Sequence, residues 1–167
     1  MILFTNNNIG TLLGVGERAA EALKKAEAIG YTGSEYYATL GLYHEHMLTL
    51  DQSHRDPAEE NYRRAIELNP NNVSAYIWLA TLLVQGTDPP QGERALELLE
   101  QALSLDPLNR VANGNMQVGL MRAQRSEGVE ANLKRLIDLD PDYQTYKTLL
   151  TGYYFSGGRL LEGAEML

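Results

Sequence analysis

The sequence has 167 residues and no cysteine, which excludes disulfides, thiolate metal sites and cysteine nucleophiles. Apolar residues make up 44% of it and charged residues 22%, as is ordinary for a soluble globular protein that can bury a sizeable core. The formal net charge of −8 disfavours general binding to nucleic acid or to anionic membrane surfaces, because like charges repel.

The N-terminal stretch MILFTNNN predicts neither a secretion signal nor a spanning helix. It lacks a basic region, and its apolar run stops after four residues. We therefore expect a soluble protein without membrane insertion. The cytoplasm is the favoured compartment, and the periplasm is the alternative if a signal or anchor belongs to a longer natural chain.

Residues 1–33 predict a degenerate first unit of helical structure. One helical face, with apolar residues at i, i+4 and i+7, is formed by Ala19, Leu23 and Ala26. A helix before it would have to come from the first 13 residues. Gly14 and Gly16 are interpreted as turn residues, because no strand precedes them and no dinucleotide-binding glycine motif is present.

Residues 34–72 predict a pair of helices. The first helix runs from Ser34 to about Met47, and the second is expected to start at Asp56-Pro57, where aspartate caps a helix and proline fits its first turn. The second helix should end at the phrase AIELNP, because Pro70 cannot continue a helix. Its packing face consists of Ala58, Tyr62 and Ala65.

The same pair recurs in residues 73–109 and 110–143, and residues 144–167 begin another. The first helices run from Val73 to about Gln85, from Arg110 to about Gln124 and from Tyr143 to about Phe155. A second-helix start is expected at Asp88-Pro89, and second-helix ends at ALSLDP and LIDLDP. The corresponding packing faces are Ala95, Leu99, Ala102 and Val129, Leu133, Leu136.

The prolines that end these phrases recur at a regular spacing. From Pro107 to Pro141 is 34 residues, and from Pro70 to Pro107 is 37, with a proline- and glycine-rich turn, QGTDPPQG, accounting for the extra length. A period of roughly 20–50 residues is typical of stacked repeats. No alternating apolar run indicates a strand, so the predicted fold class is all-α.

These features resemble the tetratricopeptide repeat, a helix–turn–helix unit with eight signature positions. In residues 34–72 those positions hold Tyr37, Leu40, Gly41, His44, Ala58, Tyr62, Ala65 and Pro70. In residues 73–109 they hold Tyr76, Leu79, Ala80, Leu83, Ala95, Leu99, Ala102 and Pro107. The third unit departs from the pattern, with Asn113, Met116, Gln117 and Leu120 in its first helix and Leu136 in place of the second alanine.

The resemblance implies a single α-α superhelix of antiparallel helix pairs, with about four repeats and incomplete terminal units. First helices would line a concave groove. The implied function is that of a non-enzymatic protein–protein interaction scaffold, without cofactor, whose groove binds a peptide or helix of a partner protein.

Two alternatives stay open. The sequence is similar to repeat regions found in winged-helix regulators and in envelope-complex assembly factors, so the chain is interpreted as a fragment with a sensory or assembly role. The apolar C-terminal stretch GRLLEGAEML also allows self-association into a homo-oligomer.

No motif predicts catalysis or metal binding. His44 and His46 are two positions apart on a helix and diverge, so they are interpreted as solvated or packed side chains rather than as ligands, even with His54 nearby. The sequence NVS from Asn72 to Ser74 matches a glycosylation sequon, but we interpret Asn72 as a helix cap.

The groove positions implied by the resemblance give the candidate partner-binding residues. They are Thr39, Glu45, Ile77, Trp78, Asn115, Val118, Met121, Arg122 and Phe155. Only Asn115 is of the type with which relatives clamp an acidic chain terminus, so an apolar or amphipathic segment is the expected ligand. Trp78 is interpreted either as the anchor for that ligand or as a packing residue between units.

Overall fold

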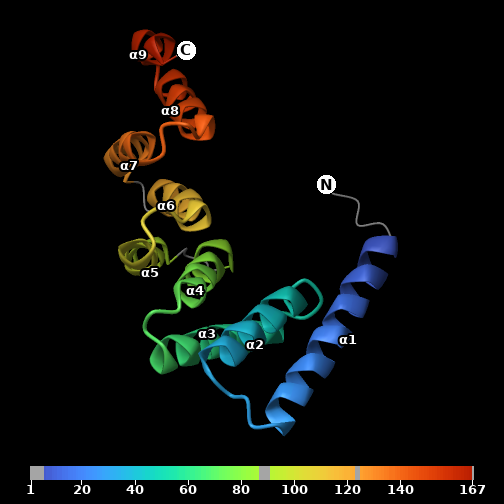
Figure 1. The fold of residues 1–167 in the computed structure, drawn as a ribbon. Coiled ribbons are helices and arrows are strands. Elements are labelled where there is room, and N and C mark those ends of the chain that lie inside the picture. The colour runs from blue at the N-terminus through green and yellow to red at the C-terminus, as the bar shows by residue number, and fades with distance from the viewer. Residues whose placement is uncertain (1–5, 87–90, 123–124, 167) are drawn as a thin grey trace. The chain divides into compact units, whose positions relative to one another are not determined.

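The computed structural model describes residues 6–86, 91–122 and 125–166. The described residues form helices and no strand, which confirms the all-α prediction. In chain order the elements are α1 (Asn6–Ala28), α2 (Ser34–Met47), the 3₁₀ helix η1 (Gln52–His54), α3 (Arg55–Leu68), α4 (Val73–Gly86), α5 (Gly92–Leu105), α6 (Arg110–Arg122), α7 (Ser126–Leu139), α8 (Gln144–Ser156) and α9 (Leu160–Glu165) (Figure 1).

The chain divides into two compact units, residues 1–82 and 83–167. The first unit contains α1, α2, η1, α3 and most of α4, and the second contains the end of α4 and the helices α5 to α9. Among the described helices, none combines the length and the apolar composition that crossing a bilayer requires.

The helix pairs lie where the sequence pattern predicts them. α2 matches its predicted range, and α4, α6 and α8 agree with theirs to within two residues. α3, α5 and α7 each end two residues before the proline of their phrase. The residue after each helix has a φ between −144° and −138°, as expected for extended backbone near a proline. The prolines therefore act as helix stop signals.

Gly14 and Gly16 do not form a turn, and this prediction is wrong. Both lie inside α1, which runs without a break from Asn6 to Ala28. A glycine in a helix costs about 1 kcal/mol relative to alanine. At Gly16 a tertiary contact explains the choice, because a Cβ there would lie 3.2 Å from Met47 Sδ. The missing side chain lets the end of α2 approach α1.

Asp56 is also not the N-cap of its helix. α3 begins one residue earlier, at Arg55, and η1 leads directly into it. The N–H of Arg55 therefore already donates to Gln52 O, and the capping carboxylate acts earlier, where Asp51 accepts from the N–H of Ser53 at 2.9 Å. The other predicted start, Asp88-Pro89, lies outside the described residues.

Asparagines cap two of the first helices. Asn72 Oδ1 accepts from the N–H of Ala75 at 3.1 Å at the start of α4, and Asn109 Oδ1 accepts from the N–H of Ala112 at 3.0 Å at the start of α6. The interpretation of Asn72 as a cap is confirmed.

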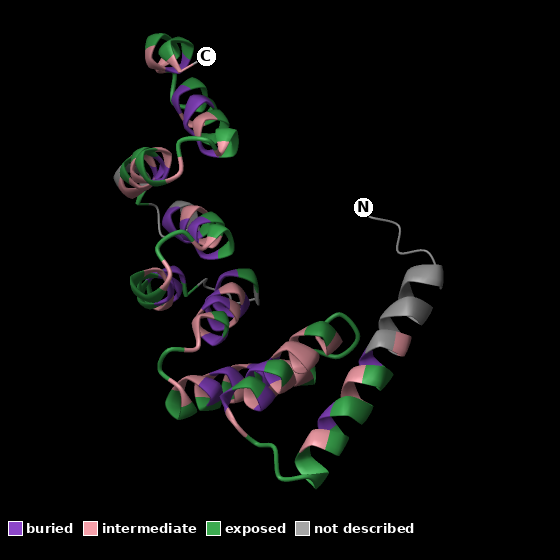
Figure 2. Cartoon of the chain, viewed as in Figure 1, coloured by how far each residue is buried: buried purple, intermediate pink, exposed green. Residues whose placement is uncertain are grey.

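The α2–α3 pair is packed through a contact between Gly41 and Tyr62. A Cβ on Gly41 would lie 2.6 Å from the Tyr62 ring, so only glycine lets this ring lie against the backbone of α2. Tyr62 is completely buried, as are Ala58 and Ala65 on the same face of α3 (Figure 2). The Tyr62 hydroxyl donates to the carboxylate of Glu45, which satisfies its buried polar atom.

Ser34 joins α2 to α3 and to the start of α4. Its Oγ donates to Ala65 O at 2.8 Å and accepts from Asn72 Nδ2 at 2.8 Å. Because Asn72 also caps α4, one chain of hydrogen bonds fixes the loop between α3 and α4 against α2.

In the second unit the buried faces carry larger apolar side chains. The predicted faces of α5 and α7 are all buried (Figure 2). They pack with α6 and α8, from which Met116, Leu120, Tyr146, Leu150 and Tyr154 are buried.

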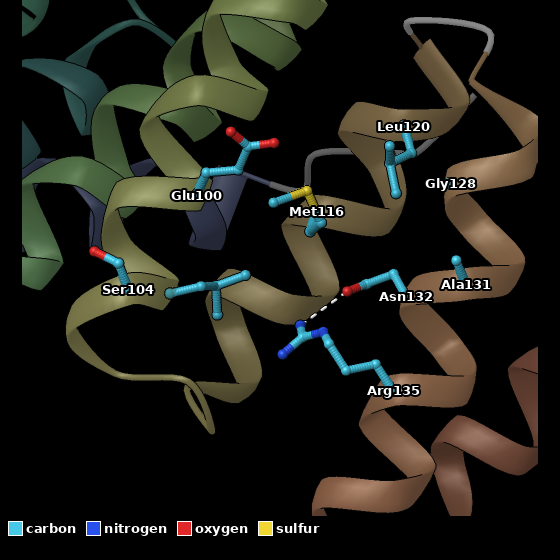
Figure 3. Close-up of a pocket in the computed structure, with 9 residues that line it drawn as sticks. Glu100, Ser104, Met116, Leu120, Gly128, Ala131, Asn132 and Arg135 are labelled. Carbon is cyan, nitrogen blue, oxygen red and sulfur yellow. Dashed lines mark hydrogen bonds between the residues drawn. The ribbon is translucent and has the colours of Figure 1, made fainter.

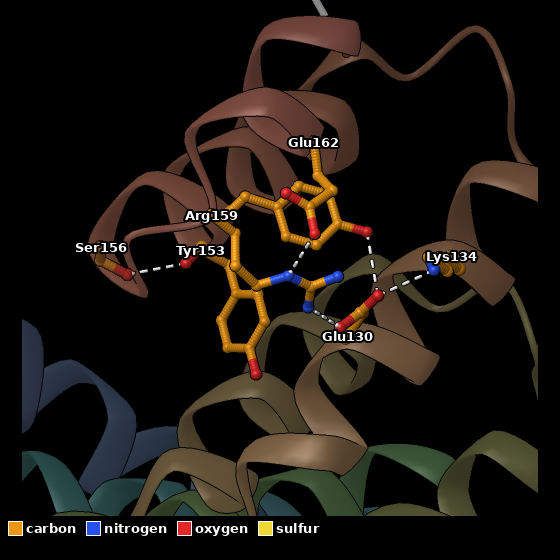
Figure 4. Close-up of polar contacts among 7 residues, drawn as sticks. Glu130, Lys134, Tyr153, Ser156, Arg159 and Glu162 are labelled. Atoms are coloured by element: carbon orange, nitrogen blue, oxygen red, sulfur yellow. Dashed lines mark hydrogen bonds and ion pairs between the residues drawn. The ribbon is translucent and has the colours of Figure 1, made fainter.

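A polar network fixes α9 to α7 and α8 (Figure 4). The Glu130 carboxylate accepts from Arg159 Nη1 at 2.6 Å, Lys134 Nζ at 2.8 Å and the Tyr154 hydroxyl at 3.0 Å. Arg159 also pairs with Glu162 at 2.9 Å. Hydrogen bonds from Lys134 and Arg159 lower the pKa of Glu130 to about 2.

Candidate functional site

A pocket of about 400 Å³ lies between α2, α4 and the loop that connects α3 to α4. All of its lining belongs to the first unit. The lining residues are Glu35, Ala38, Thr39, Asn69, Asn71, Asn72, Val73, Ser74 and Trp78.

The apolar part of the pocket is built on a cluster of alanines. Ala38, Ala65 and Ala75 are buried together, and Trp78 packs against them while remaining half-exposed. The Trp78 ring also lies 6.1 Å, centroid to centroid, from the ring of Tyr62. Because the side chains beneath the indole are small, one part of the ring packs in the core and another part lines the pocket.

The polar part of the pocket comes mainly from asparagines of the α3–α4 loop. Asn69 Oδ1 accepts from the N–H of Asn71 at 3.1 Å. The Asn72 side chain is held by the hydrogen bond with which it caps α4 and by its donation to Ser34 Oγ. Asn69 and Asn72 therefore shape the loop that they line. Glu35 is the one charged side chain among the residues that line this pocket. The result is an apolar floor with an amide-rich, weakly acidic rim.

The predicted groove residues of the first unit take different positions. Thr39 and Trp78 line the pocket together. Ile77 is buried, at 5% exposure. Glu45 is half-buried and accepts from the Tyr62 hydroxyl, and burial raises the pKa of its carboxyl group.

The predicted groove residues of the second unit are also spread out. Asn115 is half-buried, whereas Val118 is 44% exposed on α6. Phe155 is 42% exposed on α8, and its ring contacts the position of Gly163 on α9. Met121 and Arg122 belong to α6, but their side chains lie outside the described residues.

Sequence reasoning missed the asparagine rim and a second pocket. Asn69 and Asn71 lie in a loop that the helical pattern treats only as a stop signal. The second pocket, of about 490 Å³, is lined by residues of α5, α6 and α7 in the second unit (Figure 3). The sequence offers one signal for this pocket: α6 departs from the repeat pattern at Met116, which lines it.

The histidines do not form a metal site within the described residues. No group of three or more potential ligands gathers there. His44 Nδ1 and His54 Nδ1 lie 2.7 Å apart, which is the distance of a hydrogen bond from one ring to the other. Burial, and then the nearby His54, lower the pKa of His44. His46 is exposed, so the interpretation of packed and solvated histidines agrees with this geometry.

Comparisons with known proteins agree with the repeat architecture. A family model described as a tetratricopeptide repeat matches residues 61–93. A search of curated protein sequences finds no match. Among solved structures, MamA is similar with a TM-score of 0.71 and 15% identity, covering 99% of this chain and 92% of MamA.

Two further solved structures are similar at 22% identity. YrrB, described as a TPR protein with an unusual peptide-binding site, has a TM-score of 0.61, with 83% of this chain and 68% of YrrB covered. TTC0263, a thermophilic TPR protein of Thermus thermophilus, has a TM-score of 0.60, with 95% of this chain and 84% of TTC0263 covered. Such repeat proteins are typically non-enzymatic scaffolds for protein–protein interaction. The chain therefore carries a tetratricopeptide-repeat match at residues 61–93, and it shares its fold of recurring helix pairs with these solved structures.

Proposed function

We propose that the pocket between α2 and α4 binds a peptide or helix of a partner protein by receiving an apolar side chain against Trp78. The observation that carries the proposal is the position of this indole, which is packed on the alanine cluster and also lines a pocket of about 400 Å³. Tryptophans that are held in place this way often dominate the binding energy of an interface, because little side-chain entropy is lost on binding.

The rim of the pocket suits a polypeptide backbone. Asn69, Asn71 and Ser74 supply uncharged donors and acceptors around an apolar floor. Such a combination of apolar centre and polar rim is typical of protein interfaces. The unusual peptide-binding site described for YrrB supports a peptide as the class of ligand.

Charge also limits which class of partner segment the pocket favours. Glu35 is exposed at the pocket, and the whole chain carries a net charge of −8. A segment with a basic residue next to its apolar anchor is therefore favoured over an acidic one, both in encounter and in the bound state.

The experiment is a selection of binders from a random peptide library, followed by affinity measurements on two matched variants. Thr39→Arg places a long cationic side chain in the pocket. Thr148→Arg is the control, because both threonines are exposed on first helices and both donate to the carbonyl four residues earlier. We expect selected peptides to bind Thr39→Arg at least about tenfold more weakly, as for the loss of a central contact.

The control variant should bind the peptides as the unchanged protein does. If every selected peptide bound Thr39→Arg with unchanged affinity, the pocket would not be the peptide site. Circular dichroism on both variants separates loss of binding from loss of folding.

A further inference from the structure

The second unit contains a pocket of about 490 Å³ whose charges differ from those of the first. It lies between α5 and α7, with α6 behind it (Figure 3). Its lining residues are Glu100, Leu103, Ser104, Met116, Leu120, Gly128, Ala131, Asn132 and Arg135.

The floor of this pocket is apolar, and small residues on α7 make room for it. Leu103, Met116 and Leu120 supply the apolar surface. A Cβ on Gly128 would lie 2.7 Å from Leu120 Cδ2, so glycine allows α7 to pass close to that leucine. Methionine adapts its shape to irregular apolar groups, so this floor suits an aliphatic side chain.

Arg135 brings a positive charge to one end of the pocket. Its Nη2 donates to Asn113 Oδ1 and to Asn132 Oδ1, each at 2.9 Å. Both acceptors are neutral amides, and in the described parts of the chain no carboxylate forms an ion pair with this half-buried guanidinium. The amides hold the side chain in place without neutralising its charge.

Asn132 adds an unsatisfied donor beside the guanidinium. Its Nδ2 is buried and has no acceptor within the described residues. A buried amide without a partner is destabilising. Because the Oδ1 of the same amide accepts from Arg135 Nη2 at 2.9 Å, this unsatisfied donor lies next to the guanidinium.

Glu100 gives the pocket a second, opposite charge. It is exposed on α5, whereas Asn132 and Arg135 project from α7 on the other side of the pocket (Figure 3). Glu100 forms no ion pair with a described residue of α5 or of α7. The pocket is therefore polarised, with a negative group on α5 and a positive group on α7.

We propose that this pocket is a second protein-binding surface, for a partner segment that carries an aspartate or glutamate side chain next to an aliphatic one. The carboxylate accepts from the Arg135 guanidinium and from Asn132 Nδ2, and the aliphatic side chain lies on Met116 and Leu120. Charge-assisted bonds from a planar guanidinium to a carboxylate are stronger than those to an amide, so the partner's carboxylate is a better acceptor than the asparagines.

Glu100 determines which charge is preferred in a ligand on the α5 side of the pocket. It disfavours a second acidic residue there and favours a basic one. The two pockets of the chain would then select different segments, since the first favours a basic residue near its anchor and the second requires an acidic one.

The test uses the absence of cysteine in the chain. Ser104→Cys places a single thiol at the pocket, and Ser156→Cys is the matched control, because both serines are exposed and both donate to the carbonyl three residues earlier. The probes are two short peptides with an N-terminal thiol, two leucines and an amidated C-terminus. They differ only in carrying glutamate or glutamine after the leucines. Capture by reversible disulfide exchange is measured by mass spectrometry.

We expect Ser104→Cys to capture the glutamate peptide about tenfold more than the glutamine peptide, as for a charge-assisted contact replacing a neutral one. Ser156→Cys should show no preference, and Arg135→Gln added to Ser104→Cys should abolish it.

Equal capture of the two peptides at Ser104→Cys would overturn the proposal. So would a preference that persists in the folded Arg135→Gln variant or that appears equally at Ser156→Cys. The comparison of the two peptides needs no change at Arg135, so it decides the question even if that variant does not fold.

A third peptide, with glutamine and a free C-terminal carboxylate, tests the other source of a carboxylate group. If only that peptide were captured preferentially, the group that binds Arg135 would be a chain terminus and not an acidic side chain. That result would contradict the proposal.

Discussion

The α2–α3 pair of the first unit and the α6–α7 pair of the second follow the same repeat pattern but are packed differently. In α2–α3, Gly41 lies against the ring of Tyr62, and Ala65 completes a fully buried face. In α6–α7, Gln117 occupies the position that corresponds to Gly41, and Leu136 occupies that of Ala65. Both polar atoms of the Gln117 amide are buried there without a partner in the described residues.

The difference shows what the small residues of the pattern do. Where they are present, two helices pack closely and the few buried polar groups are paired, as Tyr62 is with Glu45. Where larger side chains replace them, both polar atoms of the Gln117 amide remain unpaired in the described residues.

The largest effect should come from adding a methyl group at the tight contact. Gly41→Ala should lower the free energy of unfolding by about 1–3 kcal/mol, because the new Cβ meets the buried Tyr62 ring. Gly152→Ala is the matched control in α8, where a Cβ would meet nothing within 4 Å. That variant should be more stable by about 0.5–1 kcal/mol. Urea denaturation measures both, and changes of the same sign would contradict the role given to Gly41.

The α6–α7 pair offers a substitution that should raise the free energy of unfolding. Gln117→Met removes the unpaired amide and keeps a side chain of similar length, so we expect it to raise the free energy of unfolding by about 1 kcal/mol. Gln101→Met, at an exposed position of α5, should change it little. A destabilised Gln117→Met protein would show that the amide has a partner that matters for folding.

A smaller effect is expected at the polar network of the last helices. Glu130→Gln should cost less than about 1 kcal/mol at pH 7, because the pairs that it removes are partly exposed and screened. The pH dependence of the free energy of unfolding tests the network more clearly. With a folded-state pKa of about 2, below the ordinary value of 4.5, Glu130 contributes stability that is present above pH 4.5 and lost as the pH falls toward 2.

Unfolding measured at pH 7, 4.5 and 2.5 should therefore show a smaller acid-induced loss in Glu130→Gln than in the unchanged protein. Glu97→Gln, at an exposed position of α5, serves as the control and should behave like the unchanged protein. An unaltered pH profile in Glu130→Gln would mean that the network does not hold Glu130 ionised.

The smallest effect concerns the histidine pair of the first unit. Because burial lowers the pKa of His44, its neutral form favours the folded state, and this contribution is present above the ordinary pKa of 6.5 and lost as the pH falls below it. His44→Asn should therefore reduce the fall in melting temperature between pH 7.5 and pH 5.5. His46→Asn is the control, because the His46 side chain is exposed on the same helix. Equal slopes in both variants would contradict the assignment.

The sequence was sufficient for the helix pairs because local chemistry decides where they end. Pro70, Pro107 and Pro141 stop helices whatever surrounds them, and Asn72 caps a helix with its own side chain. α1 could not be predicted in this way. The local preference of Gly14 and Gly16 for a turn is overridden in α1, where Gly16 makes a tertiary contact with Met47.

The candidate site was predictable only in part. Helical register placed both Ile77 and Trp78 on the groove, but neighbouring residues on a helix point about 100° apart. The structure buries Ile77 and leaves Trp78 beside the pocket. The rim of Asn69 and Asn71, and the charges of Glu100 and Arg135 on two helices, depend on distances between segments that periodicity does not encode.

Trp78 allows the central claim to be tested directly, because it is the one tryptophan in the chain. The measurement is a fluorescence titration with a peptide selected from the random library, followed at the emission of Trp78. We expect a saturable change in emission with one peptide bound per chain, shifted to at least about tenfold higher peptide concentration in Thr39→Arg and unshifted in Thr148→Arg. Binding that is evident by calorimetry but leaves the emission of Trp78 unchanged would contradict the claim that the partner peptide docks on this indole.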